Sequence, residues 1–583
     1  MTRRNIRGSS FTWVLVGAVS IAVVLSGASC TPGTGSSSTK GGGGTGADSG
    51  SGGSTSVSSG GGGDGGGFID PGTGPFGDFP MAAVVLDGLD QGIATLFQNT
   101  PGMDTGGPCM SEPPMDAMFP RNWTPLFFEW SAPPELNVFE LQLEVDNQLR
   151  PLVVYTTQPS YTMELGTWKN LATHSAAHDV KVTVRGAHFE NGALTLGPLV
   201  GTSGTIHIAP VAAPGSVVYW TSTGGTSFQG FTIGDTTSKT VLSPPMAGPT
   251  STGGTTNCVS CHTSSPDGKL IIYSRDADNG TRAIDARYVT GGVPSADVIS
   301  PSALALLGRN KQTAPVLSPA HYSAGDAVAV SILSDPTINN GRYEIVWTDL
   351  HAADQSGWGI LARNGDPRFV ASSPAWRRDG GEIAYVTSAA GGEGVIAASD
   401  GIDPTMDINT IPYNNRAGGD AKPFPGASDP NYHEFYPVYS PEDTFLAFNR
   451  TDNSPPDSYS EPAAEVFIVP GQGGSPTRLR ANDPPACTGL ASPGLTNAWA
   501  RWAPKAETFD GLKYYWVVFS SNRRQAAGQR PQLYVAAVVT KTEAGMETIA
   551  AEYPAIYATA QDAGGNNHTP AWDFFEVEQI PPK

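Results

Sequence analysis

A short phrase recurs along the C-terminal part of this chain and constrains the fold more than any other feature. It is close to P-A-W-S-P-D-G and is followed by a short apolar run. In one copy, Pro374-Ala375-Trp376 leads through Asp379-Gly380 to Ile383-Ala384-Tyr385-Val386. A tight turn between two apolar runs is typical of a β-hairpin, so each copy predicts one small antiparallel unit. The copies begin at Ser265, Pro319, Pro374, Pro437, Trp502 and Pro570.

Repeated β units of this length predict a β-propeller, because one unit cannot bury its apolar face alone. The last copy lies at the extreme C-terminus and has room for one hairpin only. The runs Val217 to Trp220 and Phe228 to Ile233 lie at the other end of the same region and are expected to complete that unit. We therefore expect an all-β chain whose residues 211–583 form a six-bladed propeller.

A second folded unit is expected ahead of the repeats, over residues 109–210. Between Val138 and Asp146 the sequence alternates strictly, with Phe139, Leu141 and Leu143 on the apolar face of a half-buried strand. Further short apolar runs with Pro and Gly between them follow it. Several short strands with this punctuation predict a β-sandwich of the fibronectin or immunoglobulin kind.

The stretch Cys258-Val259-Ser260-Cys261-His262 reads C-x-x-C-H, the attachment signature of c-type haem. Two thiols at this spacing can bond to one edge of a porphyrin, and the adjacent histidine then supplies an axial nitrogen to the iron. Cys258 and Cys261 are thus predicted to hold haem c, with His262 as the proximal ligand. A C-x-x-C disulfide and half of a zinc site are the alternatives.

The sixth iron ligand is left open by the sequence. Aligning the repeats places His433 near the start of an innermost strand, and His568 lies close to the equivalent place in the last copy. Met246 precedes the motif in a Pro/Gly-rich loop and would raise the haem potential relative to a second histidine. We expect a histidine as the sixth ligand, His433 first and His568 second; a water-bound or open iron and Met246 are the alternatives.

Residues 1–29 are predicted to be a lipoprotein signal peptide. Arg3, Arg4 and Arg7 precede a short apolar core, and Gly27-Ala28-Ser29-Cys30 resembles a lipobox. Cys30 is thus the expected lipidation site, although Gly27 stands where leucine is usual. A Gly/Ser-rich stretch follows, and residues 30–108 are predicted to be a flexible tether. An exported protein anchored by lipid, in the outer membrane, is expected.

Charge and the remaining cysteines add two expectations. The formal net charge of −20 argues against nucleic acid as a partner. Cys109 and Cys487 are left over after the other three cysteines are assigned, and in an exported protein such a pair favours a disulfide.

The repeats resemble those of TolB-like β-propellers. Combined with the C-x-x-C-H motif directly before Ser265-Pro266-Asp267-Gly268 and the preceding sandwich, the chain resembles uncharacterised bacterial lipoproteins that carry a TolB-like propeller and one haem motif. The resemblance implies this architecture and an envelope location, and it implies no settled function.

Three hypotheses for function follow. The first is a haem lipoprotein that transfers electrons or senses redox state, with a redox protein or another envelope protein as partner. The second is a propeller scaffold that binds a protein or glycan, with the haem structural or absent. The third is a haem peroxidase in which His433 and Glu434 act at an open iron. No G-x-S-x-G, H-E-x-x-H or P-loop motif points to a different enzyme.

Overall fold

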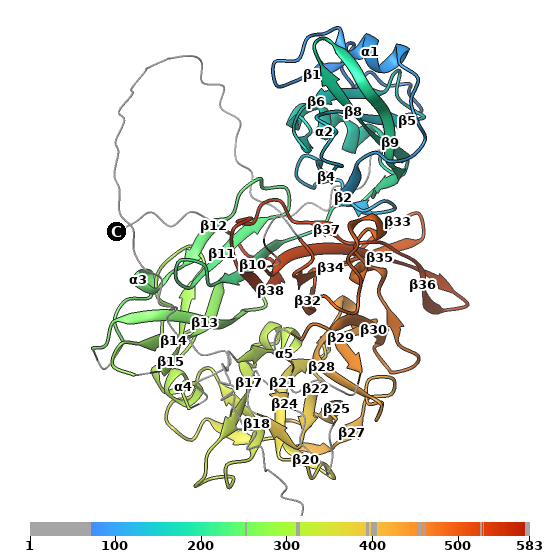
Figure 1. The fold of residues 1–583 in the computed structure, drawn as a ribbon. Coiled ribbons are helices and arrows are strands. Elements are labelled where there is room, and N and C mark those ends of the chain that lie inside the picture. Colours follow the sequence, from blue (N-terminus) through green and yellow to red (C-terminus); the bar gives the residue numbers. More distant parts are fainter. Residues whose placement is uncertain are drawn as a thin grey trace, which may run out of the picture.

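The computed structural model describes residues 72–577, apart from 251–252, 281, 310–314, 392–395, 398–404, 453–457, 459–460, 525–527 and 529. The predicted signal peptide and Cys30 therefore lie outside the described residues. The fold is all-β, as predicted. Figure 1 shows two parts, a smaller domain at the top (blue to teal) and a larger one below it that runs from green to red. None of the helices in the described ranges is long and apolar enough to span a membrane.

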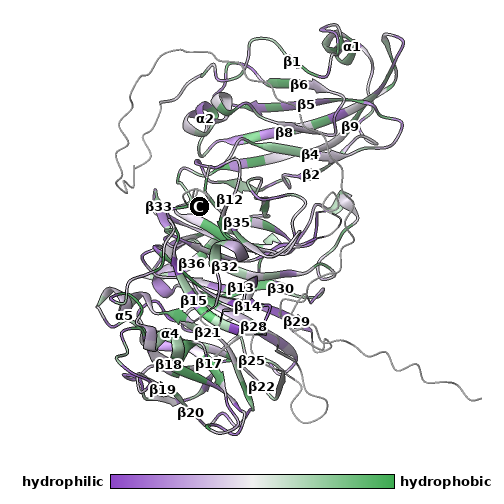
Figure 2. Cartoon of the chain, turned by 90° about the vertical axis from the view of Figure 1, so that its left-hand side faces the viewer, coloured by the Kyte–Doolittle hydropathy of each residue, from purple (hydrophilic) through white to green (hydrophobic). Residues whose placement is uncertain are grey.

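The first domain contains two sheets and two short helices. Hydrophobic and hydrophilic residues are interspersed along its strands (Figure 2). The larger sheet runs in the order β1 (Val84–Val85), β6 (Leu152–Thr156), β5 (Val138–Val145), β8 (Asp179–Glu190), β9 (Ala193–Ile208) and β3 (Met118–Phe119), the smaller sheet is β2 (Cys109–Glu112), β4 (Phe127–Ser131) and β7 (Ser160–Thr162), and the helices are α1 (Ile93–Asn99) and α2 (Leu165–His174).

The tether predicted for residues 30–108 extends too far toward the C-terminus, because β1 and α1 of the first domain lie within that range. Strand β1 pairs in parallel with β6, and α1 packs Ile93 and Phe97 against Val138 and Tyr155. This packing also covers the face of β5 that the alternation predicted to be exposed. Glu140 on that face is buried, where it accepts hydrogen bonds from Arg185 and Tyr155. The apolar residues that follow the Gly/Ser-rich stretch therefore belong to the first domain.

The larger domain is built from antiparallel sheets that follow one another along the chain. Their strands, from the inner edge outward, are β38 (Asn567–Asp573), β10 (Ser216–Thr221), β11 (Ser227–Thr232), β12 (Lys239–Leu242); β13 (Thr256–Ser264), β14 (Leu270–Ala277), β15 (Arg282–Tyr288); β16 (Val316–Leu317), β17 (Val328–Ser334), β18 (Tyr343–Asp349), β19 (Trp358–Ile360); β21 (Val370–Trp376), β22 (Glu382–Ser388), β25 (Asp407–Pro412), β27 (Lys422–Pro423); β28 (Tyr432–Tyr439), β29 (Phe445–Asp452), β30 (Glu465–Pro470), β31 (Thr477–Arg478); and β32 (Asn497–Trp502), β34 (Leu512–Ser521), β35 (Gln532–Glu543), β36 (Met546–Glu552).

Short elements complete this domain. A parallel bridge from Tyr343 to Val370 links the third and fourth of these groups of strands. The predicted repeat at Pro319 opens with a short helix, because the Ser318 side chain caps it and Pro319 suits the first helical turn. The short elements are α3 (Pro244–Ala247), α4 (Pro301–Leu307), α5 (Pro319–Ser323), β20 (Ala362–Asn364), β23 (Ala390–Gly391), β24 (Ile396–Ala397), β26 (Gly418–Asp420), β33 (Glu507–Phe509), β37 (Ile556–Tyr557) and the 3-10 turns Pro441–Asp443, Arg480–Asn482 and Ala486–Thr488.

The inner strands of this domain form a closed ring. Around the ring, β38 contacts β13, and contacts continue through β16, β21, β28 and β32 back to β38. The C-terminal strand β38 pairs with β10, with Trp572 opposite Val217. The red and green ends of the domain accordingly lie side by side in Figure 1. The predicted completion of the last sheet by residues from the other end is confirmed.

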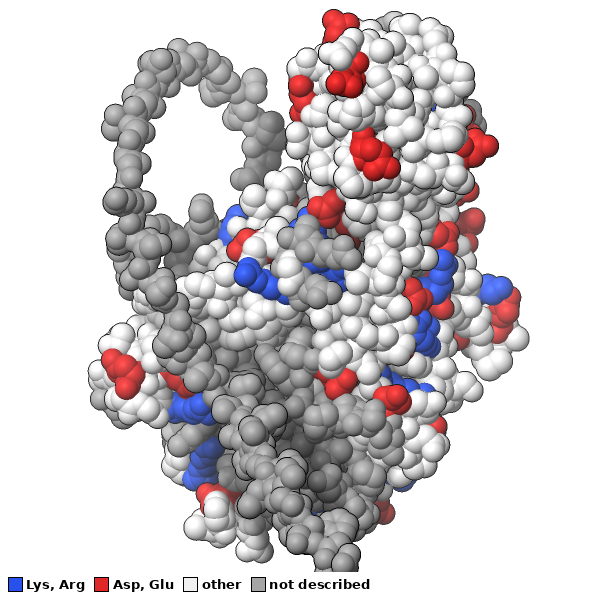
Figure 3. All heavy atoms as spheres, viewed as in Figure 1, with Lys and Arg blue, Asp and Glu red and all other residues white. Residues whose placement is uncertain are grey.

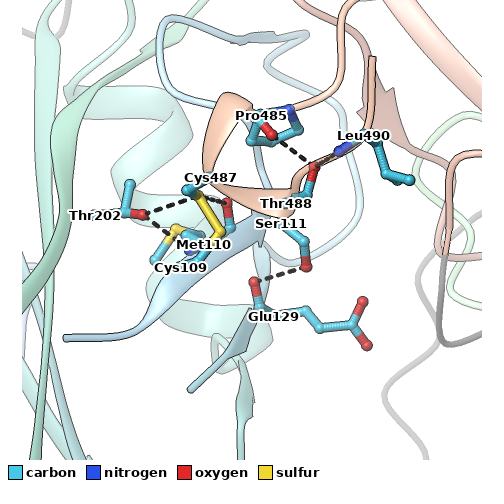
Figure 4. The surroundings of a disulfide bond; sticks show 9 residues. All are labelled: Cys109, Met110, Ser111, Glu129, Thr202, Pro485, Cys487, Thr488 and Leu490. Atoms are coloured by element: carbon cyan, nitrogen blue, oxygen red, sulfur yellow. Dashed lines mark hydrogen bonds between the residues drawn. A yellow bond between two sulfur atoms is a disulfide. The ribbon is translucent and has the colours of Figure 1, made fainter. Parts of the chain in front are cut away.

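The two domains are joined by covalent and polar contacts. Cys109 of β2 and Cys487 form a disulfide with a Cα–Cα distance of 5.7 Å (Figure 4). Nearby, Arg524 pairs with Glu129 at 2.9 Å. The hydroxyl oxygens of Thr124 and Thr559 lie 2.8 Å apart. These contacts fix the first domain against the side of the ring formed by β35 and β37.

Glu112 makes this domain contact sensitive to pH. Burial raises the pKa of Glu112 to about 8, against the opposing effect of Arg523. A carboxyl group whose pKa is raised on folding contributes stability that is full below its unfolded value, near 4.5, and is lost as pH rises through about 8. The melting temperature should therefore fall by several degrees between pH 5 and pH 8. Glu112→Gln should flatten this dependence, measured by thermal unfolding across that range, and an equal fall in the variant would contradict this role of Glu112.

Candidate functional site

A cavity of about 290 Å³ lies where the inner strands of the ring meet. Its walls come from all of the strands of that ring, including Val316 at the end of β16. Aromatic side chains and prolines make up much of the lining. Charged side chains enter it at a few positions, and Cys261 and His262 of the predicted haem motif lie in its wall.

The inner strands are irregular at the cavity. In five of them a residue that is not glycine has a positive φ, between 40° and 57°, and the ladder with the neighbouring strand shifts register at the same place. The five residues all line the cavity, and they occupy the same position in the repeat: Cys261, Ser373, Tyr436, Trp499 and Thr569.

This conformation is costly for residues with a side chain. A non-glycine residue with positive φ loses about 1–2 kcal/mol, and such strain persists where the surrounding structure imposes it, commonly at functional sites. Each shift is a β-bulge, which re-aims the side chains around it. The five bulges turn one end of each strand toward the centre of the ring and so create the cavity wall.

Three tryptophans of the repeated phrase have a structural role at this wall. Trp376, Trp502 and Trp572 are buried. The indole N–H groups of Trp376 and Trp502 donate to the carbonyl oxygens of Val316 and Val438 on the preceding inner strand, so these two bonds tie successive sheets together. The indole N–H of Trp572 donates to the carbonyl oxygen of Pro214, next to β10 of its own sheet.

Other lining residues depart from the repeat. His262 stands where three other copies have proline, and Arg378 stands where three copies have Pro266, Pro441 and Pro504. Arg501 occupies a position that holds small or medium side chains elsewhere (Thr263, Ala375, Val438 and Ala571). Because the fold repeats without these side chains, they are not required for it, and positions that break a local rule are expected at functional sites.

The charges at the cavity act on one another and are partly buried. Burial lowers the pKa of Arg501, and the carboxylate of Asp573 opposes that shift. Burial raises the pKa of Asp573, which Arg378, Arg501 and a hydrogen bond donated by Ser264 oppose. Within the described part of the chain, no carboxylate forms an ion pair with the guanidinium of Arg378 or Arg501.

His262 is held neutral in the wall. Burial lowers its pKa to about 4, with the Val218 carbonyl opposing and Arg501 adding to the shift. Its Nε2 lies 3.2 Å from that carbonyl, so Nε2 carries the proton and donates it. The buried Nδ1 is then an acceptor that no described group satisfies. His262 also lies against Phe228, with ring centroids 4.5 Å apart.

The C-x-x-C-H motif lies in β13, where its side chains do not share one face. Cys258 pairs with Asp276 and His262 with Tyr273, which place them on opposite faces of the sheet because strand faces alternate. Cys258 is 2% exposed and does not belong to the cavity lining, whereas Cys261 at the bulge does. In the folded strand Cys258 therefore lies outside the cavity that Cys261 and His262 line, and this arrangement does not fit haem c.

The three predicted distal residues occupy different surroundings. His568 lies near His262, and burial, with a contribution from His262, lowers the pKa of His568 to about 3. Its ring also stacks on Trp499 at 5.0 Å. His433 is buried, and its Nδ1 accepts a hydrogen bond from the Met406 amide. Met246 of α3 packs against the cluster around Val259. None of the three belongs to the described lining of the cavity.

Comparisons with known proteins give a fold-level likeness. No family model and no curated protein matches the chain. The chain is similar to TolB from Acinetobacter baumannii, with 14% identity over 67% of this chain and 79% of that one and a TM-score of 0.34. It is also similar to a protein assigned as TolB from Agrobacterium tumefaciens, with 13% identity over 60% and 95% of the two chains and a TM-score of 0.29. Likenesses at this level carry no argument about function.

The sequence analysis missed Arg378 and Arg501. Both lie inside copies of the repeat, and an alignment of the copies residue by residue would have exposed them as departures.

Proposed function

We propose that this chain is an exported, lipid-anchored scaffold that binds a protein partner in the central cavity of a six-bladed, TolB-like β-propeller. The closed ring of inner strands supports the propeller architecture. The first domain supports a β-sandwich fixed to its side, and the sequence around Cys30 supports the anchor.

One observation carries the proposal. Strained bulges in five strands converge on a single cavity, which also collects the polar side chains that depart from the repeat. Other copies of the repeat lack these polar side chains, so the fold does not require them, and ligand binding gives a reason for their presence beside the strained bulges. The cavity volume, about 290 Å³, suits a short segment of a partner.

Peptide selection tests this proposal. The full chain is screened against displayed random peptides, and the enriched peptides are titrated while tryptophan fluorescence is recorded. Because Trp499 and Trp502 line the cavity, binding there should change their emission saturably, and enriched peptides should compete with one another. Failure to enrich any peptide, together with saturable binding of neutral or acidic oligosaccharides, would overturn the protein partner in favour of a glycan.

A haem lipoprotein with an electron-transfer or redox-sensing role is the second candidate. The C-x-x-C-H motif and the unsatisfied Nδ1 of His262 favour it. Its test is a reduced-minus-oxidised spectrum of protein made with haem-attachment machinery, beside a Cys258→Ala/Cys261→Ala control. An α-band that survives acid–acetone extraction and is lost in the control is the result this candidate predicts. Because Cys261 lines the cavity and Cys258 does not, the scaffold proposal predicts no such band.

A further inference from the structure

The cavity differs in charge from the protein as a whole. The chain carries a net charge of −20. At the cavity, Arg378 and Arg501 face one carboxylate, Asp573, while His262 is neutral. In Figure 3 the charged side chains visible on the first domain are mainly acidic, whereas Lys and Arg appear lower down among further acidic residues. A local excess of cations inside an acidic protein favours an anionic ligand.

Arg501 is the residue that most clearly indicates an anionic ligand. Its guanidinium donates to the neighbouring Ala500 carbonyl at 2.8 Å. Among the described residues no carboxylate completes an ion pair with it. A desolvated charge is expensive unless it is paired. Small side chains at the equivalent positions of other copies indicate that the ring can form without this cost.

The shape and polarity of the wall favour a polypeptide. Trp376, Trp502 and Trp572 are at most 4% exposed and their indole N–H groups are already bonded, so they offer no open platform for a sugar ring. The cavity is instead suited to a narrow ligand. The bare Nδ1 of His262 needs a donor, which a peptide N–H can supply beside an acidic group.

We propose that the cavity recognises a carboxylate of the partner polypeptide, held between Arg378 and Arg501. The inference rests on the proposed function and names the group that is bound. Guanidinium groups bind carboxylates through charge-assisted hydrogen bonds. The partner's apolar atoms then lie against the aromatic and proline side chains of the wall.

The test measures dissociation constants for peptides enriched on the full chain from two displayed libraries, one with free C-termini and one with internal segments. Each peptide is compared with its C-terminal amide and with its Glu→Gln or Asp→Asn analogue, which separates the two sources of the carboxylate. Loss of the recognised carboxylate should weaken binding about 10- to 100-fold. Arg501→Gln should raise the dissociation constant of the acidic peptide by a similar factor and leave that of its neutral analogue nearly unchanged.

Controls separate this inference from the proposed function. Arg378→Gln and Arg501→Lys provide further variants if Arg501→Gln does not fold, and Lys541→Gln, a surface residue paired with Glu543, should leave every dissociation constant unchanged. Peptides that bind equally well without a carboxylate, yet no longer bind when Ser373→Trp fills the cavity, would overturn the inference of a bound carboxylate and leave the proposed function standing. Peptides unaffected by filling the cavity would overturn both.

Discussion

Replacing Ser373 with tryptophan should abolish partner binding, with a loss of at least about 100-fold in affinity. Ser373 lies in the cavity wall with φ 47°. Tyr436 and Trp499 occupy the same repeat position with φ 56° and 57°, so the backbone there already accepts a large aromatic side chain. The added indole would fill space that the ligand needs. Titration of the selected peptides measures the effect.

Two variants serve as controls for this result. Ser373→Ala removes only a hydroxyl and should bind as the native protein does. Thr569→Trp fills the cavity from another strand at the equivalent position and should block binding as well. If Ser373→Trp is folded, by circular dichroism and melting temperature, and still binds peptides within a few-fold of the native affinity, the cavity is not the binding site.

Trp572→Ala should lower the free energy of unfolding by about 3–5 kcal/mol. Trp572 is 2% exposed, packs in the core shared by both domains, and donates its indole N–H to the Pro214 carbonyl at 2.8 Å. It lies on β38, the strand that closes the ring through its pairing with β10. The loss therefore combines a cavity in the core with a weakened closure.

Chemical denaturation followed by circular dichroism measures this effect. Phe574→Ala is the matched control, because Phe574 lies two residues further on and is 48% exposed. That change should cost less than about 1 kcal/mol. Equal, small losses in both variants would show that the closure through β38 contributes little to stability.

Much of the larger domain was predictable from the sequence because its information is local. The Asp-Gly turns and apolar runs specify hairpins within a few residues, and Trp376 and Trp502 of the phrase bond to the preceding inner strand. The completion of the last sheet by β10 followed from counting strands. The repeat at Pro319 was the exception, since Ser318 and Pro319 start a helix there.

The N-terminal boundary of the first domain was harder to predict from the sequence. The segment 84–99 is apolar but was assigned to the tether, whereas β1 within it pairs with β6 more than sixty residues later. Glu140 looks exposed by alternation and is buried, since α1 covers that face and Arg185 and Tyr155 satisfy its carboxylate. Such long-range packing leaves no local pattern to read.

The site was predicted only in part. The motif drew attention to Cys258, Cys261 and His262, and two of these line the cavity. The separation of Cys258 from His262 depends on a bulge at Cys261, which residue types alone do not specify. The convergence of Arg378 and Arg501 depends on the closure of the ring, because they lie more than a hundred residues apart along the chain.

The most direct test of cavity binding is a crystal structure of the full chain with the tightest peptide from the selection. Electron density for the peptide inside the ring, with a carboxylate between Arg378 and Arg501 and contacts to Tyr436 and Trp499, is the predicted result. Density for the peptide on the first domain or on the outer strands, with the ring interior free of it, would contradict the proposed function.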